Sequence, residues 1–103
     1  MDVRHVEQNI EVAVVLLKAM SNENRLRIIC SLYKGEKSVR ELEKIVGLSQ
    51  SALSQHLCKL REDKLVTTRR EAQTVYYSLA DERITDLLHT LYDIYSPQIA
   101  ATG

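Results

Sequence analysis

The chain has 103 residues, and its 14 Lys and Arg are balanced by 14 Asp and Glu. A chain of this length suits one small domain with a modest core, and its balanced charge gives no sign of a polyanionic partner. It has no apolar run near the roughly 18 residues that a membrane-spanning helix needs, so no membrane partner is expected. Two cysteines and an N-terminus unlike a secretion signal predict a reducing, cytoplasmic location.

Residues 3–20 are expected to form the first helix, because their apolar residues recur every three or four positions. The recurring positions are Val6, Ile10, Ala13, Val14, Leu17 and Met20. Val12, Val15 and Leu16 add apolar side chains outside this stripe. The segment therefore carries more apolar surface than one core-facing stripe needs.

A second helix is expected to begin after Ser21 or Asn22, either of which can cap it, and to end at Gly35. Its apolar face carries Leu26, Ile29, Cys30 and Tyr33. The simplest interpretation of Cys30 is therefore a small residue buried in the core.

Residues 38–63 are predicted to form a helix, a glycine turn and another helix. Ser38 and Glu41 have the spacing of a capping box. Gly47 can take the left-handed conformation that ends a helix, and Ser49 can cap the next one. The second of these helices buries a leucine stripe at Leu53, Leu57 and Leu60. This pattern is typical of a helix-turn-helix.

The face opposite the leucine stripe carries hydroxyl, amide and basic groups: Gln50, Ser51, Ser54, Gln55, Lys59 and Arg61. Between Ser49 and Arg61 the only formal charges are Lys59 and Arg61, both positive, so this helix can approach a polyanion. Such side chains bind phosphates and pair with base edges in a major groove. We therefore expect double-stranded DNA as the partner.

Residues 65–79 change from a helical to an alternating period and are rich in Thr, Val and Tyr, which predicts two strands. The residues from Glu71 to Thr74 make a polar connection of hairpin length. The second helix of a helix-turn-helix is its recognition helix, and a hairpin directly after it is the wing of a winged helix-turn-helix. The fold class is therefore predicted to be mainly α, with four helices, two strands and a final helix.

The final helix is expected over residues 81–95, capped by Asp81 and ended by Ser96 and Pro97. Its apolar face comprises Ile84, Leu87, Leu88, Leu91, Ile94 and Tyr95. Together with residues 3–20 it offers more apolar surface than a small core can cover, so we expect a homodimer through these two helices. Two recognition helices about one DNA turn (~34 Å) apart would match a palindromic operator. Residues 1–103 are thus predicted to be one winged helix DNA-binding domain, with the helix-turn-helix at 38–63 and the wing at 65–79.

Three segments carry a family resemblance: SNENRLRIICSL at 21–32, GLSQSALSQHLCKLRED at 47–63 and REAQTVYYSL at 70–79. They resemble the ArsR/SmtB family of bacterial repressors, and within it the NolR/HlyU/BigR-like branch. The resemblance runs from about Val12 to Tyr95. It implies a dimeric regulator that binds imperfect palindromes in promoters and releases DNA when an inducer arrives.

The resemblance also implies which residues contact DNA in the recognition helix and in the wing. Side-chain chemistry supports the helix positions, because glutamine can pair with the adenine edge. The full candidate set is Ser49, Gln50, Ser51, Ser54, Gln55, His56, Lys59, Arg69, Arg70, Gln73 and Thr74.

No metal or other cofactor is expected. The positions that match the ligands of the family's arsenic and zinc sensors are Ser38, Arg40, Asp81, Arg83, Ile94 and Pro97. Among these only Asp81 is a metal-ligand type, and one carboxylate does not hold a tetrahedral zinc ion.

Redox sensors of the same branch use two cysteines, and the resemblance places Cys30 at the first position and Asp93 at the second. Because an aspartate cannot complete a disulfide, only Cys30 is left as a candidate redox sensor, through modification of its thiolate.

These observations favour a sequence-specific transcriptional regulator, a homodimeric repressor that an inducer releases from its operator. Two alternatives stay open: a winged helix that binds a protein partner, which an exposed apolar patch would favour, and a thiol-responsive regulator acting through Cys30. An enzyme finds no support, because the chain has no G-x-S-x-G motif and no phosphate-binding glycine loop.

Overall fold

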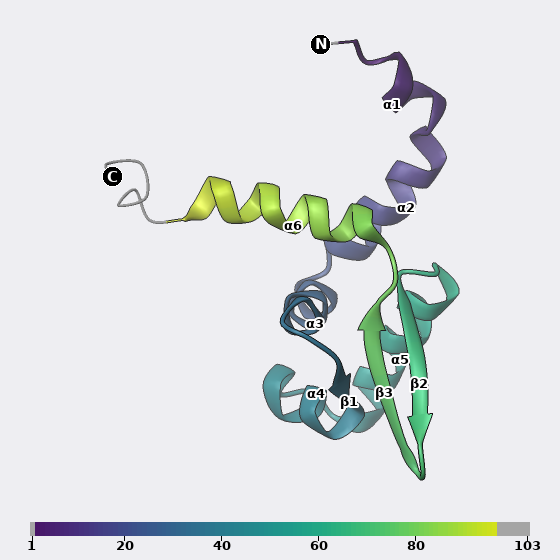
Figure 1. Ribbon diagram of the computed structural model, residues 1–103, viewed down its shortest axis with the longest axis vertical. Helices are drawn as coiled ribbons and strands as arrows, with labels where there is room; N and C mark the ends of the chain where they lie inside the picture. The colour runs from purple at the N-terminus through teal and green to yellow at the C-terminus, as the bar shows by residue number, and fades with distance from the viewer. Residues whose placement is uncertain (1, 97–103) are drawn as a thin grey trace.

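The computed structural model describes residues 2–96, in which a helical body carries a small sheet and two helical arms (Figure 1). The helices are α1 (Arg4–Gln8), α2 (Ile10–Met20), α3 (Glu23–Tyr33), α4 (Val39–Val46), α5 (Gln50–Glu62) and α6 (Glu82–Tyr95). The strands are β1 (Lys37–Ser38), β2 (Val66–Glu71) and β3 (Thr74–Leu79). The helix-turn-helix is thus α4 and α5, and the hairpin of β2 and β3 is its wing, as the sequence predicts.

The core lies where α3, α4 and α5 pack against one another and against the sheet. Its fully buried large side chains are Ile28, Ile29, Leu42, Leu53, Leu57, Leu60 and Ile84. The three leucines of α5 lie one above the other at i, i+4 and i+7, so the leucine stripe points inward and the opposite face of α5 points to solvent.

Local capping signals define the ends of the helices around the turn. The Ser38 hydroxyl accepts from the Glu41 backbone N–H at 3.2 Å, and the Glu41 carboxylate accepts from the Ser38 N–H at 2.9 Å, which completes the capping box. Gly47 ends α4 with a left-handed φ of 73°, and Ser49 caps α5. Of the two expected caps of α3, Asn22 is the one used, and Asp81 caps α6.

The first helix differs from the expectation, because residues 3–20 form two helices that meet at Asn9. The Asn9 backbone leaves helical geometry at φ −118° and ψ 24°, and its side-chain amide donates to the His5 carbonyl at 2.8 Å. A short polar side chain that bonds the nearby backbone competes with the helix in this way. The prediction of one continuous helix was therefore wrong at this residue.

The sheet has three strands rather than two, in the antiparallel order β1-β3-β2. The missed strand β1 has two residues, Lys37 and Ser38, which pair with Tyr77 and Tyr76. The expected connection between the other strands is also shorter than predicted: Glu71 pairs with Thr74, so only two residues turn the chain. Ala72 in that turn has φ 56°, which is the sign that two-residue hairpin turns require.

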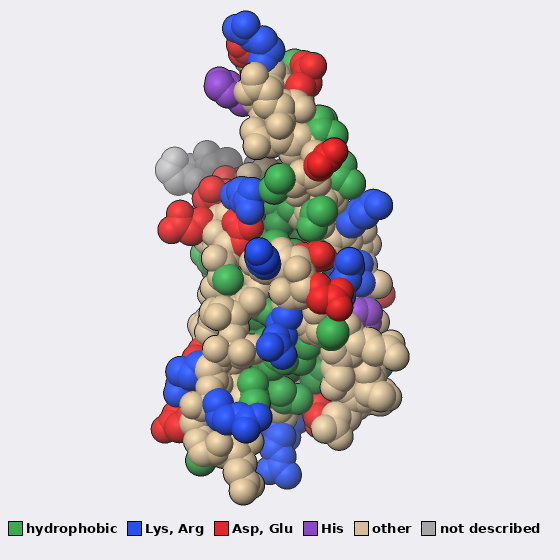
Figure 2. Space-filling view, turned by 90° about the vertical axis from the view of Figure 1, so that its right-hand side faces the viewer, with side chains coloured by type: hydrophobic (Ala, Val, Ile, Leu, Met, Phe, Trp, Pro, Cys, Tyr) green, Lys and Arg blue, Asp and Glu red, His purple; other side chains and the backbone are tan. Residues whose placement is uncertain are grey.

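The two arms leave much apolar surface outside the body. In Figure 1, α1 and α2 run away from the body in one direction and α6 in another, and Figure 2 shows hydrophobic side chains exposed along the first arm. Of the expected stripe of residues 3–20 only Met20 is buried, and α2 buries Leu16 and Ala19 from outside that stripe. The large apolar residues of segment 3–20 that are exposed are Val3, Val6, Ile10, Val12, Val14, Val15 and Leu17, and those of α6 are Tyr92, Ile94 and Tyr95.

Within residues 2–96, no helix is both long and apolar enough to cross a membrane.

Candidate DNA-binding site

The exposed face of α5 brings the predicted helix residues together. The side chains that point to solvent from its first two turns are Gln50, Ser51, Ser54 and Gln55. None of them is charged, and no carboxylate lies on α5 before Glu62 at its last position. Because the leucine stripe is buried beneath them, they sit on a rigid helix rather than on a loop.

Of the three further helix candidates, two have partners within the protein and the third is half-buried. The Ser49 hydroxyl caps the helix by accepting from the Ala52 N–H at 3.3 Å. The Lys59 ammonium lies 3.5 Å from the Asp63 carboxylate, while its side chain stays 54% exposed. His56 is half-buried, so its ring edge is only partly open to a ligand.

The tip of the wing carries the other candidates. Gln73 and Thr74 are exposed at the turn. Arg70 is also exposed, and within residues 2–96 its guanidinium makes no hydrogen bond or ion pair. On the face seen in Figure 2, Lys and Arg side chains gather over the lower half, the end of the molecule that carries the wing.

Arg69 is already engaged within the protein. Its guanidinium donates to both Glu36 carboxylate oxygens, at 3.0 and 2.6 Å, and to Glu71 at 2.8 Å. It also lies 4.6 Å from the centre of the Tyr76 ring. The hydrogen bonds from Arg69 hold the pKa of Glu36 below its usual value, and Glu36 and then Glu71 raise the pKa of Arg69. No pattern in the sequence indicates this cluster, because Glu36 and Arg69 are 33 residues apart.

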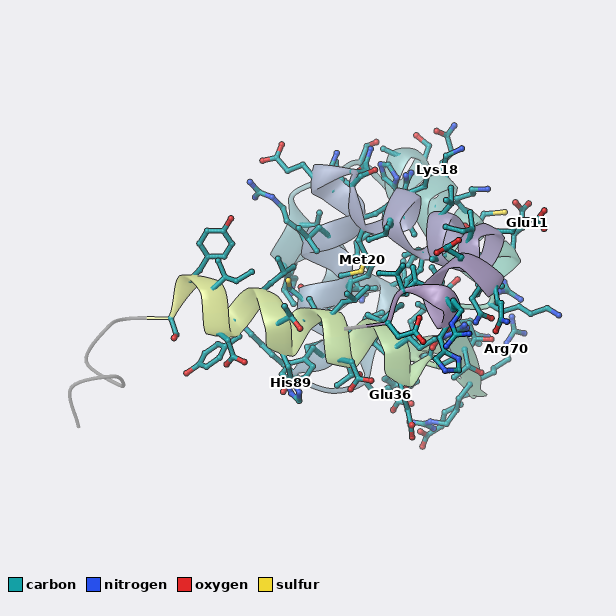
Figure 3. All side chains as sticks on the ribbon, turned by 90° about the horizontal axis from the view of Figure 1, so that it is seen from above. Glu11, Lys18, Met20, Glu36, Arg70 and His89 are labelled. Atoms are coloured by element: carbon teal, nitrogen blue, oxygen red, sulfur yellow. The ribbon has the colours of Figure 1, made fainter. Side chains whose placement is uncertain are left out.

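Cys30 is exposed, so the interpretation of a buried core residue was wrong. It lines an apolar groove of about 830 Å³ between α3 and α6, together with Leu88 and Leu91. The Tyr33 hydroxyl crosses between the two helices to His89 Nε2 at 2.7 Å. Figure 3 shows α6 running out from the body, with His89 on one side of it.

Among residues 2–96, the positions aligned with metal ligands do not form a cluster. Across the part of the chain that the structure describes, no three His, Cys, Asp or Glu side chains are placed to share an ion. The Asp81 carboxylate accepts from Arg83 at 2.6 Å. Pro97 lies outside the described residues.

Residues 22–68 match the model of the bacterial regulatory protein arsR family. The transcriptional activator HlyU of Vibrio cholerae is 52% identical over 95 residues, which cover 92% of this chain and 88% of HlyU. This chain belongs to the ArsR family. The nodulation protein NolR of Rhizobium meliloti is also 52% identical, over 85% of this chain and 72% of NolR.

Solved structures of similar proteins have the same fold. The transcriptional repressor BigR from Xylella fastidiosa matches with a TM-score of 0.88 at 38% identity, over 95% of this chain and all of that one. Reduced HlyU from Vibrio cholerae matches with a TM-score of 0.83 at 51% identity, over 91% and 99% of the two chains. The ArsR-family chain described here is therefore a winged helix-turn-helix DNA-binding transcriptional regulator and not an enzyme.

Proposed function

We propose that this regulator is a homodimeric repressor that binds a palindromic operator in double-stranded DNA and is released by an inducer. On this proposal, α5 enters the major groove with Ser49, Gln50, Ser51, Ser54, Gln55, His56 and Lys59 toward the DNA. The wing approaches the adjacent backbone with Arg70, Gln73 and Thr74. Such a protein acts in the cytoplasm, where bacterial promoters lie.

The observation that carries the proposal is the composition of the exposed face of α5. Hydroxyl and amide groups dominate its first two turns, and the first carboxylate appears only at Glu62. A helix of this kind can lie close to phosphates without repulsion and still pair with base edges. An apolar face would favour a protein partner instead.

The homodimer is supported by the apolar surface of α1, α2 and α6, which lies outside the body. Leu17 is 56% exposed and Ile94 is 58% exposed. An apolar hollow of about 580 Å³ lies where the arm of α1 and α2 meets α6, lined by Val6, Val12 and Leu87 among others. A two-fold dimer that pairs these arms buries this surface, and a two-fold protein matches a palindromic site.

The proposal is tested by selecting bound sequences from a random pool of double-stranded DNA. We expect a palindromic consensus with half-sites about one turn (~34 Å) apart, and gel-shift binding of the selected site that weakens steeply with salt. Enrichment of a single, asymmetric half-site would contradict the dimeric operator. Failure to enrich any sequence would contradict sequence-specific binding.

A thiol-responsive regulator acting through Cys30 is the second candidate, and the exposure of Cys30 in the groove between α3 and α6 favours it. The position that matches the second redox cysteine of the branch is Asp93, so the thiol would have to be modified alone. Repeating the gel shift of the selected site with an organic persulfide, for wild type and Cys30→Ser, tests this candidate. Equal responses of the two proteins would contradict it.

A further inference from the structure

The two arginines of the wing face opposite sides of the hairpin. In the strand register Arg70 pairs with Val75, whereas Arg69 pairs with Tyr76. Paired residues share one face of a sheet, and neighbouring residues along a strand point to opposite faces. Val75 packs against the core cluster, so Arg70 belongs to the face that meets the helices. Arg69 belongs to the outer face, away from α5.

On the outer face, the contacts of Arg69 form a closed cluster that spans the sheet. Its guanidinium binds both oxygens of Glu36, one oxygen of Glu71, and lies over Tyr76. A bidentate arginine–carboxylate pair within a network is the geometry in which a partly exposed ion pair contributes most. The Arg69 and Glu36 side chains are 50% and 34% exposed. To bind a DNA phosphate, the Arg69 guanidinium would have to break its hydrogen bonds to two carboxylates and would gain one anion in exchange.

This cluster attaches strand β2 to a segment of the protein with which β2 does not pair. The strand order β1-β3-β2 places β2 at the sheet edge farthest from β1. Glu36 immediately precedes β1, so the bond from Arg69 to Glu36 crosses over β3 and ties β2 to the segment that leaves α3. Without it, the hairpin beyond Tyr76 is held by its own ladder and by the packing of Val75 against the core cluster.

We propose that Arg69 is a positioning residue, which braces the wing against Glu36, and that Arg70 is the arginine of the wing that contacts DNA. This inference rests on the proposed function, because it assigns roles within a wing that approaches the operator. It assigns different roles to Arg69 and Arg70, two neighbouring residues of the same charge that cannot be distinguished from the sequence alone.

The test is a double-mutant cycle on the selected operator with Glu36→Gln, Arg69→Gln and the double variant. If Arg69 acts through Glu36, each single variant weakens binding by a similar factor, about three- to tenfold, and the double variant is no weaker than either single one. Arg69→Gln leaves the dependence of the binding constant on salt unchanged. Arg70→Gln lowers that slope by about one, as expected when one phosphate contact is lost.

Arg69→Lys sharpens the distinction, because lysine keeps the charge but loses the bidentate fork. A positioning role predicts that Arg69→Lys behaves like Arg69→Gln, whereas a phosphate contact predicts binding close to wild type. Glu62→Gln, which removes one exposed negative charge from the end of α5, measures the general effect of charge on DNA binding.

The positioning role of Arg69 is contradicted if Glu36→Gln tightens DNA binding more than Glu62→Gln does, or if neither single variant changes binding. It is also contradicted if the effects of the two single variants on binding add in the double variant. Hydrogen exchange of the β3 amides, Thr74–Leu79, in the DNA-free protein measures the brace without reference to DNA. We expect faster exchange in Glu36→Gln and Arg69→Lys than in wild type. Unchanged exchange contradicts the brace, and wild-type protein that binds no DNA contradicts the proposed function instead.

Discussion

Gln55 combines exposure on α5 with a side-chain amide that offers a donor and an acceptor in one plane. That geometry matches the adenine edge in the major groove, and a bidentate pair of this kind contributes roughly 1–3 kcal/mol of discrimination. We therefore expect Gln55→Ala to weaken binding to the selected operator by about that amount and binding to random DNA very little.

Titration of both DNAs by fluorescence anisotropy measures the effect of Gln55→Ala. Gln8→Ala is the matched control, because Gln8 is an exposed glutamine on α1 rather than on α5. Equal losses of affinity on operator and random DNA would contradict base pairing by Gln55 and indicate a backbone contact.

At the residue scale, the role of a side chain could be predicted from the sequence where its hydrogen-bond partner lies within a few residues along the chain. The capping roles of Ser38 and Ser49 follow from the residues within three positions of each. The role of Arg69 does not, because Glu36 becomes its neighbour only when β2 joins the sheet. The exposure of Cys30 could not be predicted for the same reason, because it depends on the path of α6 and not on the residues of α3 around it.

At the scale of elements, the recognition helix depends on one serine for its start. The Ser49 hydroxyl accepts from the Ala52 N–H at 3.3 Å, which is long for such a bond. We therefore expect Ser49→Ala to lower the free energy of unfolding by about 0.5–1 kcal/mol, the lower part of the range for N-cap serines. Urea denaturation followed by circular dichroism measures it.

Ser51→Ala is the matched control for the capping role, because Ser51 is exposed within the first turn of α5 and caps nothing. Both serines belong to the candidate DNA-contacting set, so either substitution is expected to weaken operator binding. Only Ser49→Ala is expected to lower stability as well. Equal stability of the two variants would show that the Ser49 bond contributes nothing.

Element boundaries could be predicted where the signal is local and periodic, as for α5 and its leucine stripe. The break at Asn9 could not, because a single side-chain bond to the His5 carbonyl interrupts an otherwise unbroken helical period. Strand β1 could not be predicted either, since two residues are too few to show an alternation of apolar and polar side chains. It exists only because Lys37 and Ser38 meet β3, whose residues lie about forty positions later in the chain.

At the scale of the whole molecule, the proposed dimer predicts that single charges on the arms separate the protomers. Leu17→Asp on α2 or Ile94→Asp on α6 removes an exposed apolar side chain, each burial being worth about 1.5–3 kcal/mol. A two-fold dimer contains each substitution twice. We expect the dimer dissociation constant to rise at least about a hundredfold, which corresponds to about 2.7 kcal/mol.

Light scattering coupled to size-exclusion chromatography measures the oligomeric state of these variants. Ile45→Asp is the control, because Ile45 is 52% exposed on α4, outside both arms, and that variant should remain dimeric. Dimers of unchanged stability in both arm variants would contradict pairing through α2 and α6.

The placement of the apolar arms outside the body also bears on how the regulator responds to its own abundance. In the proposed homodimer the arms are buried only against a second copy, so the regulator presents one recognition helix when dilute and two when paired. Below the dissociation constant of the dimer, the concentration of the paired form rises with the square of total protein. Occupancy of a palindrome would then change more steeply with protein copy number than one-to-one binding allows. Small changes in synthesis or degradation could therefore move a promoter between free and bound.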